Sequence, residues 1–147
     1  MLIPSLIASF VGTGVLLLGQ SVDHADPIRV ANYALGLIRV GDVDGLLEIM
    51  APDLKKGYIP FTPEKREELQ GIVHKDRELI GKFKEVTEIR ECTTVGGKPG
   101  VAGRIWKKSG EVFVIILVKE DNLYYYESLL TMTAKAYKDL NLIKKTG

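Results

Sequence analysis

The chain has 147 residues, and its 20 basic and 19 acidic side chains leave a formal net charge of +1. Charges of both signs are interspersed after residue 22, so the sequence lacks the basic stripe that nucleic-acid binding requires. The single cysteine, Cys92, excludes an intrachain disulfide and cannot anchor a zinc site alone. The sequence therefore predicts one domain, with no metal site and no cofactor.

The first 22 residues differ from the rest, because none of them is charged and most are apolar. A helix of this length can cross about 30 Å of hydrocarbon, so residues 1–22 are predicted to be a membrane anchor or an uncleaved signal segment. Such a segment most often exports the chain that comes after it, which would place residues 23–147 on the outer side of the membrane, in the cell envelope. The alternative is a secreted or periplasmic protein, released by cleavage near Ser21.

Small residues recur in this segment at a spacing of four, which is typical of membrane helices that approach each other closely. These predicted helix-packing positions are Ser5, Ala8, Ser9, Gly12 and Thr13. Membrane helices are rich in small residues in any case, so the pattern is weak.

Three helices are predicted next, each marked by residues that cap or break helices. The first covers residues 26–41, the second, shorter one covers 42–52, and the third covers 62–81. A short extended segment with a turn is expected between the second and the third. Asp76 interrupts the apolar side of the third helix, and His74 beside it is interpreted as a boundary histidine.

The second half of the chain predicts an antiparallel sheet. Residues 83–95 form a long strand, and residues 102–130 form three more, separated by Ser109-Gly110 and Asp121-Asn122. The middle strand of these three, residues 112–118, is apolar on both faces, so both faces need a cover. A final amphipathic helix is expected over residues 131–145. The predicted fold class is α+β: an N-terminal transmembrane helix, a curved antiparallel sheet of about four long strands wrapped by helices, and a C-terminal helix.

Strand alternation sorts the side chains of this sheet into two faces. A two-residue turn at Ser109-Gly110 would pair Trp106 with Phe113 and Arg104 with Ile115. One face is then aliphatic and is interpreted as the floor beneath the helices. The other is aromatic and is interpreted as a contact surface for a protein partner or a second copy; its binding residues are Arg104, Trp106, Phe113, Tyr124 and Tyr126.

Three stretches are similar to the nuclear transport factor 2-like superfamily, also called cystatin-like α+β cones, and especially to its exported members of unknown function. They are the helix pair over residues 34–50 with its Gly-Asp junction, residues 61–86, where the third helix ends in Gly-x-Phe, and the hairpin over residues 107–129. The resemblance covers about residues 27–131. The chain departs from it at residues 123–125, where many relatives carry a tryptophan, and in the added C-terminal helix.

The resemblance implies a curved sheet with helices on its concave side, often dimerising through the convex side, and it implies no activity. Isomerases and hydratases of the superfamily use a carboxylate in the pocket, which makes Glu127 a candidate base. The alternative for Glu127 is a carboxylate at the rim or paired with a lysine. Arg104, placed beside Trp106, could bind a carboxylate or simply lie at the rim.

The residues favour a binding function over catalysis, because no second acid, histidine or Ser/His/Asp set falls on the two predicted faces. We therefore expect a membrane-anchored, extracytoplasmic binding or assembly module that contacts a protein partner or a second copy through its sheet. Two alternatives are a small pocket enzyme of the isomerase or hydratase type with Glu127 as base, and a secreted binder of an apolar small molecule.

Overall fold

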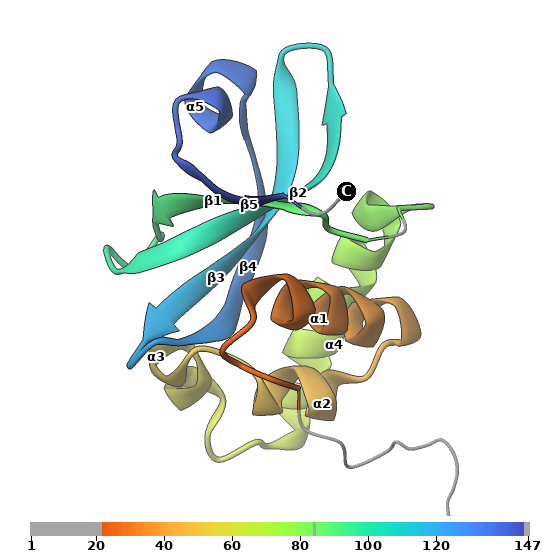
Figure 1. The fold of residues 1–147 in the computed structure, drawn as a ribbon. Coiled ribbons are helices and arrows are strands. Elements are labelled where there is room, and N and C mark those ends of the chain that lie inside the picture. The colour runs from red at the N-terminus through yellow and green to blue at the C-terminus, as the bar shows by residue number, and fades with distance from the viewer. Residues whose placement is uncertain (1–21, 84, 146–147) are drawn as a thin grey trace, which may run out of the picture.

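The computed structural model describes residues 22–83 and 85–145, which form an α+β fold (Figure 1). The helices are α1 (Pro27–Val40), α2 (Val43–Glu48), α3 (Pro52–Lys55), the 3-10 helix η2 (Lys56–Tyr58), α4 (Pro63–Ile80) and α5 (Ala134–Lys138). The strands are β1 (Glu88–Thr93), β2 (Pro99–Lys108), β3 (Glu111–Glu120), β4 (Leu123–Thr133) and β5 (Leu142–Lys145). They make a single antiparallel sheet in the order β4-β3-β2-β1-β5.

The predicted starts of the three main helices are confirmed by their capping residues. The side chains of Asp26, Asp42 and Thr62 accept hydrogen bonds from backbone N–H groups in the first turns of α1, α2 and α4. Gly41 ends α1 with a φ of 73°, a left-handed conformation that glycine adopts without a steric penalty. The segment between α2 and α4 is helical rather than extended, because Pro52 begins α3 instead of only closing α2.

The two turns of the meander are also confirmed. Lys108 pairs with Glu111 across Ser109-Gly110, and Glu120 pairs with Leu123 across Asp121-Asn122. Both residues of the second turn have positive φ, 52° and 66°, as a type I′ turn requires.

The predicted division of the sheet into a floor and a contact surface is reversed in the structure. α1, α2 and α4 cover the face that carries Phe113, Ile115, Leu117, Tyr124 and Tyr126. The opposite face, with Val112, Val114 and Ile116, packs against Tyr137 of α5. Figure 1 shows the sheet between α5 on one side and the other helices on the other. Because β3 is apolar on both faces, its sequence does not indicate which face the helices cover.

Two β-bulges break the regular alternation. Trp106 pairs with Phe113 as predicted, but Arg104 pairs with Val114 rather than with Ile115, so a bulge lies at Ile105. It puts Arg104 and Trp106 on opposite faces. The second bulge lies at Glu127, between the pair Ile116–Ser128 and the pair Leu117–Tyr126.

The predicted C-terminal helix over residues 131–145 is wrong. β4 continues to Thr133, α5 is only five residues long, and Leu142–Lys145 forms a fifth strand. This strand pairs with β1, where Ile89 lies opposite Lys144. An edge strand exposes unpaired backbone groups, so adding β5 satisfies the edge of β1.

The transmembrane part of the predicted fold class also needs correction. Residues 1–21, with the packing positions Ser5, Ala8, Ser9, Gly12 and Thr13, lie outside the described residues. Within the described ranges, 22–83 and 85–145, no helix is long and apolar enough to cross a membrane. The fold supported by the structure is α+β with a five-stranded sheet and without a membrane-spanning helix in its described part.

Candidate ligand-binding site

A pocket of about 210 Å³ lies on the helix-covered side of the sheet, between α2, α3, η2, α4 and β4. Its lining is mostly apolar, with a small number of polar groups, as is typical of small-molecule sites. The lining residues are Leu46, Met50, Leu54, Tyr58, Leu69, Ile72, Asp76, Tyr126, Glu127, Ser128 and Leu129.

The wall made by β4 is held in place by backbone hydrogen bonds from the segment after α2. The N–H of Tyr126 donates to the carbonyl of Ile49 (2.8 Å), and the N–H of Ala51 donates to the carbonyl of Tyr126 (2.7 Å). Met50 and Tyr126 thus form a parallel bridge outside the main sheet. Residues nearly 80 positions apart in the sequence are therefore fixed side by side at the pocket.

Asp76 is the ionisable residue that α4 brings to this pocket. It shares the inward stripe of α4 with Leu69, Val73 and Ile80, at intervals of three or four residues. Burial raises the pKa of the Asp76 carboxyl to about 6. Its side chain forms no ion pair and no hydrogen bond with another described residue. The pocket therefore contains a half-buried carboxylate that the described part of the chain does not neutralise.

Two phenols accompany Asp76. The side chain of Tyr126 is only 4% exposed, and burial raises its pKa, helped by the charge of Asp76 and by Tyr58. Burial also raises the pKa of Tyr58, with a smaller contribution from the charge of Glu68. Both hydroxyls thus stay protonated and can donate a hydrogen bond. The hydroxyl of Tyr126 has no hydrogen-bond partner among the described residues.

Glu127, the candidate base of the enzyme alternative, lines this pocket, but its carboxylate is bonded to a loop that does not line it. Its Oε1 accepts a hydrogen bond from the N–H of Val95 (3.2 Å), and its Oε2 lies near Gly96, both in the loop between β1 and β2. The bulge at Glu127 takes the residue out of the regular alternation on which the prediction rested. The sequence did single out Asp76 as a break in an apolar stripe, but its importance was missed.

The predicted aromatic contact surface is not exposed. Phe113 and Tyr126 are buried in the core beneath the helices, and Tyr124 is 9% exposed. Trp106 packs against Phe113, with ring centroids 5.1 Å apart, and its Nε1 donates to the carbonyl of Leu79 (2.9 Å). Of the predicted binding residues, Tyr126 alone lines the pocket, and Arg104 lies on the other face of the sheet.

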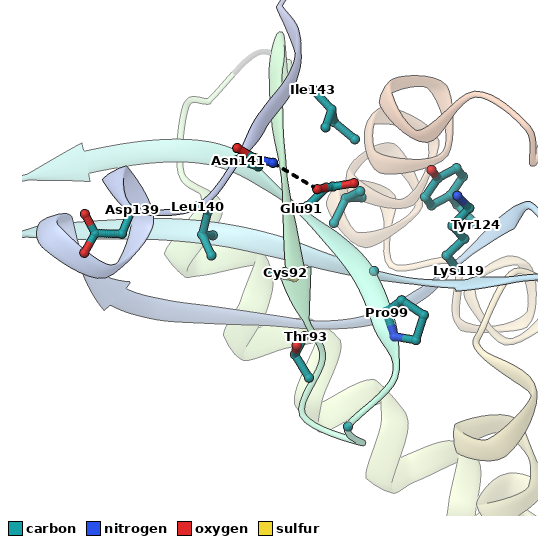
Figure 2. A pocket seen from close by; sticks show the side chains of 13 residues that line it. Glu91, Cys92, Thr93, Pro99, Lys119, Tyr124, Asp139, Leu140, Asn141 and Ile143 are labelled. Atoms are coloured by element: carbon teal, nitrogen blue, oxygen red, sulfur yellow. Dashed lines mark hydrogen bonds between the residues drawn. The ribbon is translucent and has the colours of Figure 1, made fainter.

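A larger and more open groove, of about 680 Å³, lies beside β1 and the segment that leads into β5. Figure 2 shows Glu91 and Asn141 facing each other there, joined by a hydrogen bond of 3.4 Å. Both side chains are exposed, as are Lys119 and Asp139. Burial, followed by the charge of Glu127, raises the pKa of the Cys92 thiol to about 11, which leaves it unreactive at neutral pH. The smaller pocket at Asp76 is the better candidate site.

Within residues 22–83 and 85–145 there is no group of three or more His, Cys, Asp or Glu side chains able to hold a metal ion. No model of a known protein family matches this sequence, and comparison with curated proteins and with solved structures finds no similar chain. The function of the protein therefore has to be inferred from the chemistry of the Asp76 pocket.

Proposed function

We propose that the protein binds a small, mostly apolar molecule that carries an amine, with Asp76 as the anionic partner of that amine and Tyr126 beside it. The observation that carries the proposal is the Asp76 carboxylate, half-buried among apolar side chains and without a partner among the described residues. A buried charge is costly unless it is paired, and the described chain supplies no pair. A cationic ligand would supply one.

The size of the pocket limits the ligand. Its volume of about 210 Å³ exceeds the roughly 150 Å³ of an engineered apolar cavity that binds benzene. A single ring with a short polar substituent therefore fits. The lining side chains of Leu54, Leu69 and Ile72 would contact the ring, while the carboxylate and the phenol would meet the substituent.

The test compares benzylamine with benzyl alcohol by isothermal titration calorimetry at pH 7.5. The two molecules have nearly the same shape, but only benzylamine is a cation. We expect benzylamine to bind about tenfold more tightly, because a charge-assisted hydrogen bond is worth about 1.5–3 kcal/mol. This preference should shrink as the pH falls below about 6, where Asp76 takes up its proton.

Two variants make the test specific. Asp76→Asn keeps the shape of the side chain and should abolish the preference for benzylamine. Glu127→Gln removes a carboxylate whose residue lines the same pocket but whose Oε1 is bonded to Val95, so this control should retain the preference. Equal affinities of the two ligands for the unmodified protein, or a preference that survives in Asp76→Asn, would refute the proposal.

A second candidate function, proton transfer, is favoured by one observation: a carboxyl with a pKa of about 6 can both take and return a proton near neutral pH. Asp76 would remove the proton next to a ketone carbonyl, while the hydroxyl of Tyr126 donates a hydrogen bond to the oxygen on which negative charge develops. NMR in D₂O would follow deuterium exchange into cyclohexanone. Exchange no faster than that given by an equal concentration of acetate would exclude this function.

The relationship to the nuclear transport factor 2-like superfamily is likewise a proposal. It is supported by the order of the elements and by an antiparallel sheet with α1, α2 and α4 on one face and a pocket between them. A similar pocket in such folds would be compatible with ligand binding, but the fold alone does not identify a ligand.

A further inference from the structure

A third hollow, of about 320 Å³, lies on the face of the sheet opposite the Asp76 pocket, beneath α5. Its lining contains four cationic side chains and one carboxylate, a formal charge of +3. The residues are Glu88, Arg90, Arg104, Lys107, Val112, Ala134, Tyr137 and Lys138. They come from β1, β2, β3 and α5, so the hollow is built by several elements and not by one charged loop.

The carboxylate of Glu88 is already satisfied within the protein. Its Oε2 accepts a hydrogen bond from the hydroxyl of Tyr137 (2.5 Å) and lies 3.3 Å from Nε of Arg90. Arg90 also donates to the backbone carbonyls of Lys138 (3.2 Å) and Leu140 (3.0 Å), and its guanidinium lies over the Tyr137 ring, 4.9 Å from the centroid. Glu88 and Arg90 therefore form a base of mutually paired side chains for the hollow.

The other three cations of the lining make no comparable contacts with the protein. The side chains of Arg104, Lys107 and Lys138 form no ion pair and no hydrogen bond with another described residue, although the charge of Arg104 acts on Glu88 from a distance. Arg104 is half-buried, while Lys107 and Lys138 reach solvent. All three residues line the same hollow, and Glu88 is the one acidic residue in its lining. Like charges that share a site repel each other unless an anion is present.

The bulge at Ile105 is what brings two of these cations together. Regular alternation would send Arg104 and Lys107, three positions apart, to opposite faces of the sheet. In the structure Arg104 pairs with Val114 and Lys107 pairs with Val112, and both valines lie on the α5-covered face. Bulges are frequent next to functional sites, where they redirect a side chain.

We propose that this hollow binds a small organic phosphate, with its phosphate group held between Arg104, Lys107 and Lys138. A guanidinium offers a planar pair of donors that matches phosphate oxygens, and the two ammonium groups add flexible positive charge. The volume lies at the lower end of the range for small-molecule pockets, which leaves room for a few carbon atoms beside the phosphate. This proposal does not depend on the function proposed for the Asp76 pocket.

The test is titration of the full chain with glycerol 3-phosphate and, separately, with inorganic phosphate, followed by calorimetry at low ionic strength. We expect saturable binding of glycerol 3-phosphate, at least as tight as that of inorganic phosphate and weakened by added salt. Arg104→Gln and Lys107→Gln should each weaken it about tenfold, since each removes a charge-assisted contact. Lys107 is exposed, so its variant does not endanger folding.

Two control variants distinguish binding at this hollow from a general loss of positive charge and from binding at the Asp76 pocket. Lys75→Gln removes an exposed cation from α4 and should leave the affinity unchanged. Asp76→Asn should also leave the affinity for glycerol 3-phosphate unchanged, because Asp76 lines the other pocket. The two proposals can therefore fail independently. Absence of saturable binding, tighter binding of inorganic phosphate than of its ester, or equal binding by Arg104→Gln, Lys107→Gln and Lys75→Gln would each overturn the proposal.

Discussion

Two carboxyl groups lie on opposite sides of the sheet, Asp76 on α4 and Glu88 on β1, and their surroundings drive their pKa values in opposite directions. Burial raises the pKa of Asp76 to about 6. Burial acts on Glu88 in the same sense and is the largest influence on it. Hydrogen bonds from Tyr137 and Arg90 and the charge of Arg104 outweigh it and hold the pKa of Glu88 below its ordinary value.

The two acids differ in whether other side chains pair with the carboxylate. Glu88 is only 5% exposed, yet its partners make its charged form part of the structure. Asp76 is less buried but has no partner among the described residues, so its charged form opposes folding. A strongly buried acid is thus not in itself a sign of function, whereas an unpartnered one in a pocket is. Substitutions at either acid or at its partners test this difference.

The largest expected effect is on the partnered side. Arg90→Met removes one partner of a buried carboxylate and the donor to two backbone carbonyls, so we expect the free energy of unfolding to fall by about 3 kcal/mol. Urea denaturation at pH 7 measures the loss. Arg29→Met is the matched control, because Arg29 pairs with Asp26 while 72% exposed and should contribute less than about 0.5 kcal/mol. A loss as small as that of the control would show that Glu88 does not need Arg90.

Tyr137→Phe should have a smaller effect, because it removes one hydrogen bond to Glu88 and keeps the ring that packs beneath Arg90. We expect a loss of about 1.5 kcal/mol at pH 7. Since the pKa of Glu88 is depressed in the folded protein, this contribution is present above the ordinary pKa of the acid and is lost as the pH falls through the folded value. The difference in stability between the two proteins should therefore narrow as the pH falls below the ordinary pKa of the acid. A difference that does not change with pH, even where NMR shows Glu88 to be protonated, would assign the loss to packing.

Asp76→Asn should act in the opposite direction and stabilise the protein. The pKa of Asp76 is raised on folding, so the folded state resists its ionisation and stability falls as the pH rises from about 4 to about 6. Above that range the variant should be more stable by about 1–2 kcal/mol, a figure reduced because the carboxyl is only half-buried. Below pH 3.5 the two proteins should unfold together. A variant that is less stable at pH 7 would mean that the Asp76 carboxylate has a partner in the folded chain.

The least disturbing test titrates both acids in the unmodified protein. Carbon-13 NMR of the side-chain carboxyls should give a midpoint near 6 for Asp76 and one below 4.5 for Glu88. Benzylamine at saturation should lower the midpoint of Asp76 and leave Glu88 in place, because linkage is reciprocal. Equal midpoints for the two acids would remove the distinction between the two faces.

The features that could be predicted from the sequence depend on neighbours along the chain. Asp26, Asp42 and Thr62 cap helices by bonding to backbone two or three residues away, and Asp121-Asn122 needs only its own positive φ angles to make a turn. The cap and turn residues therefore located the main helices and the hairpins correctly.

The features that were missed depend on residues far apart. β5 forms because the edge of β1, about 50 positions earlier, is available to Leu142–Lys145. The bulges at Ile105 and Glu127 are set by pairing with β3, whose two apolar faces contain no information on register. The Asp76 pocket requires β4 to meet Ile49–Ala51, so the sequence could mark Asp76 as unusual without showing what surrounds it.

The contact between β4 and the segment Ile49–Ala51 also covers part of an open sheet edge. Open sheet edges are templates for pairing with other chains, and β4 is an edge strand. At Tyr126 its outward backbone groups are occupied by Ile49 and Ala51, and at Tyr124 by His24. The opposite edge, β5, is short and ends in Lys144-Lys145, whose charges disfavour pairing with a strand of another chain. The contacts that hold the pocket wall in place thus also close this stretch of the β4 edge to pairing with another chain.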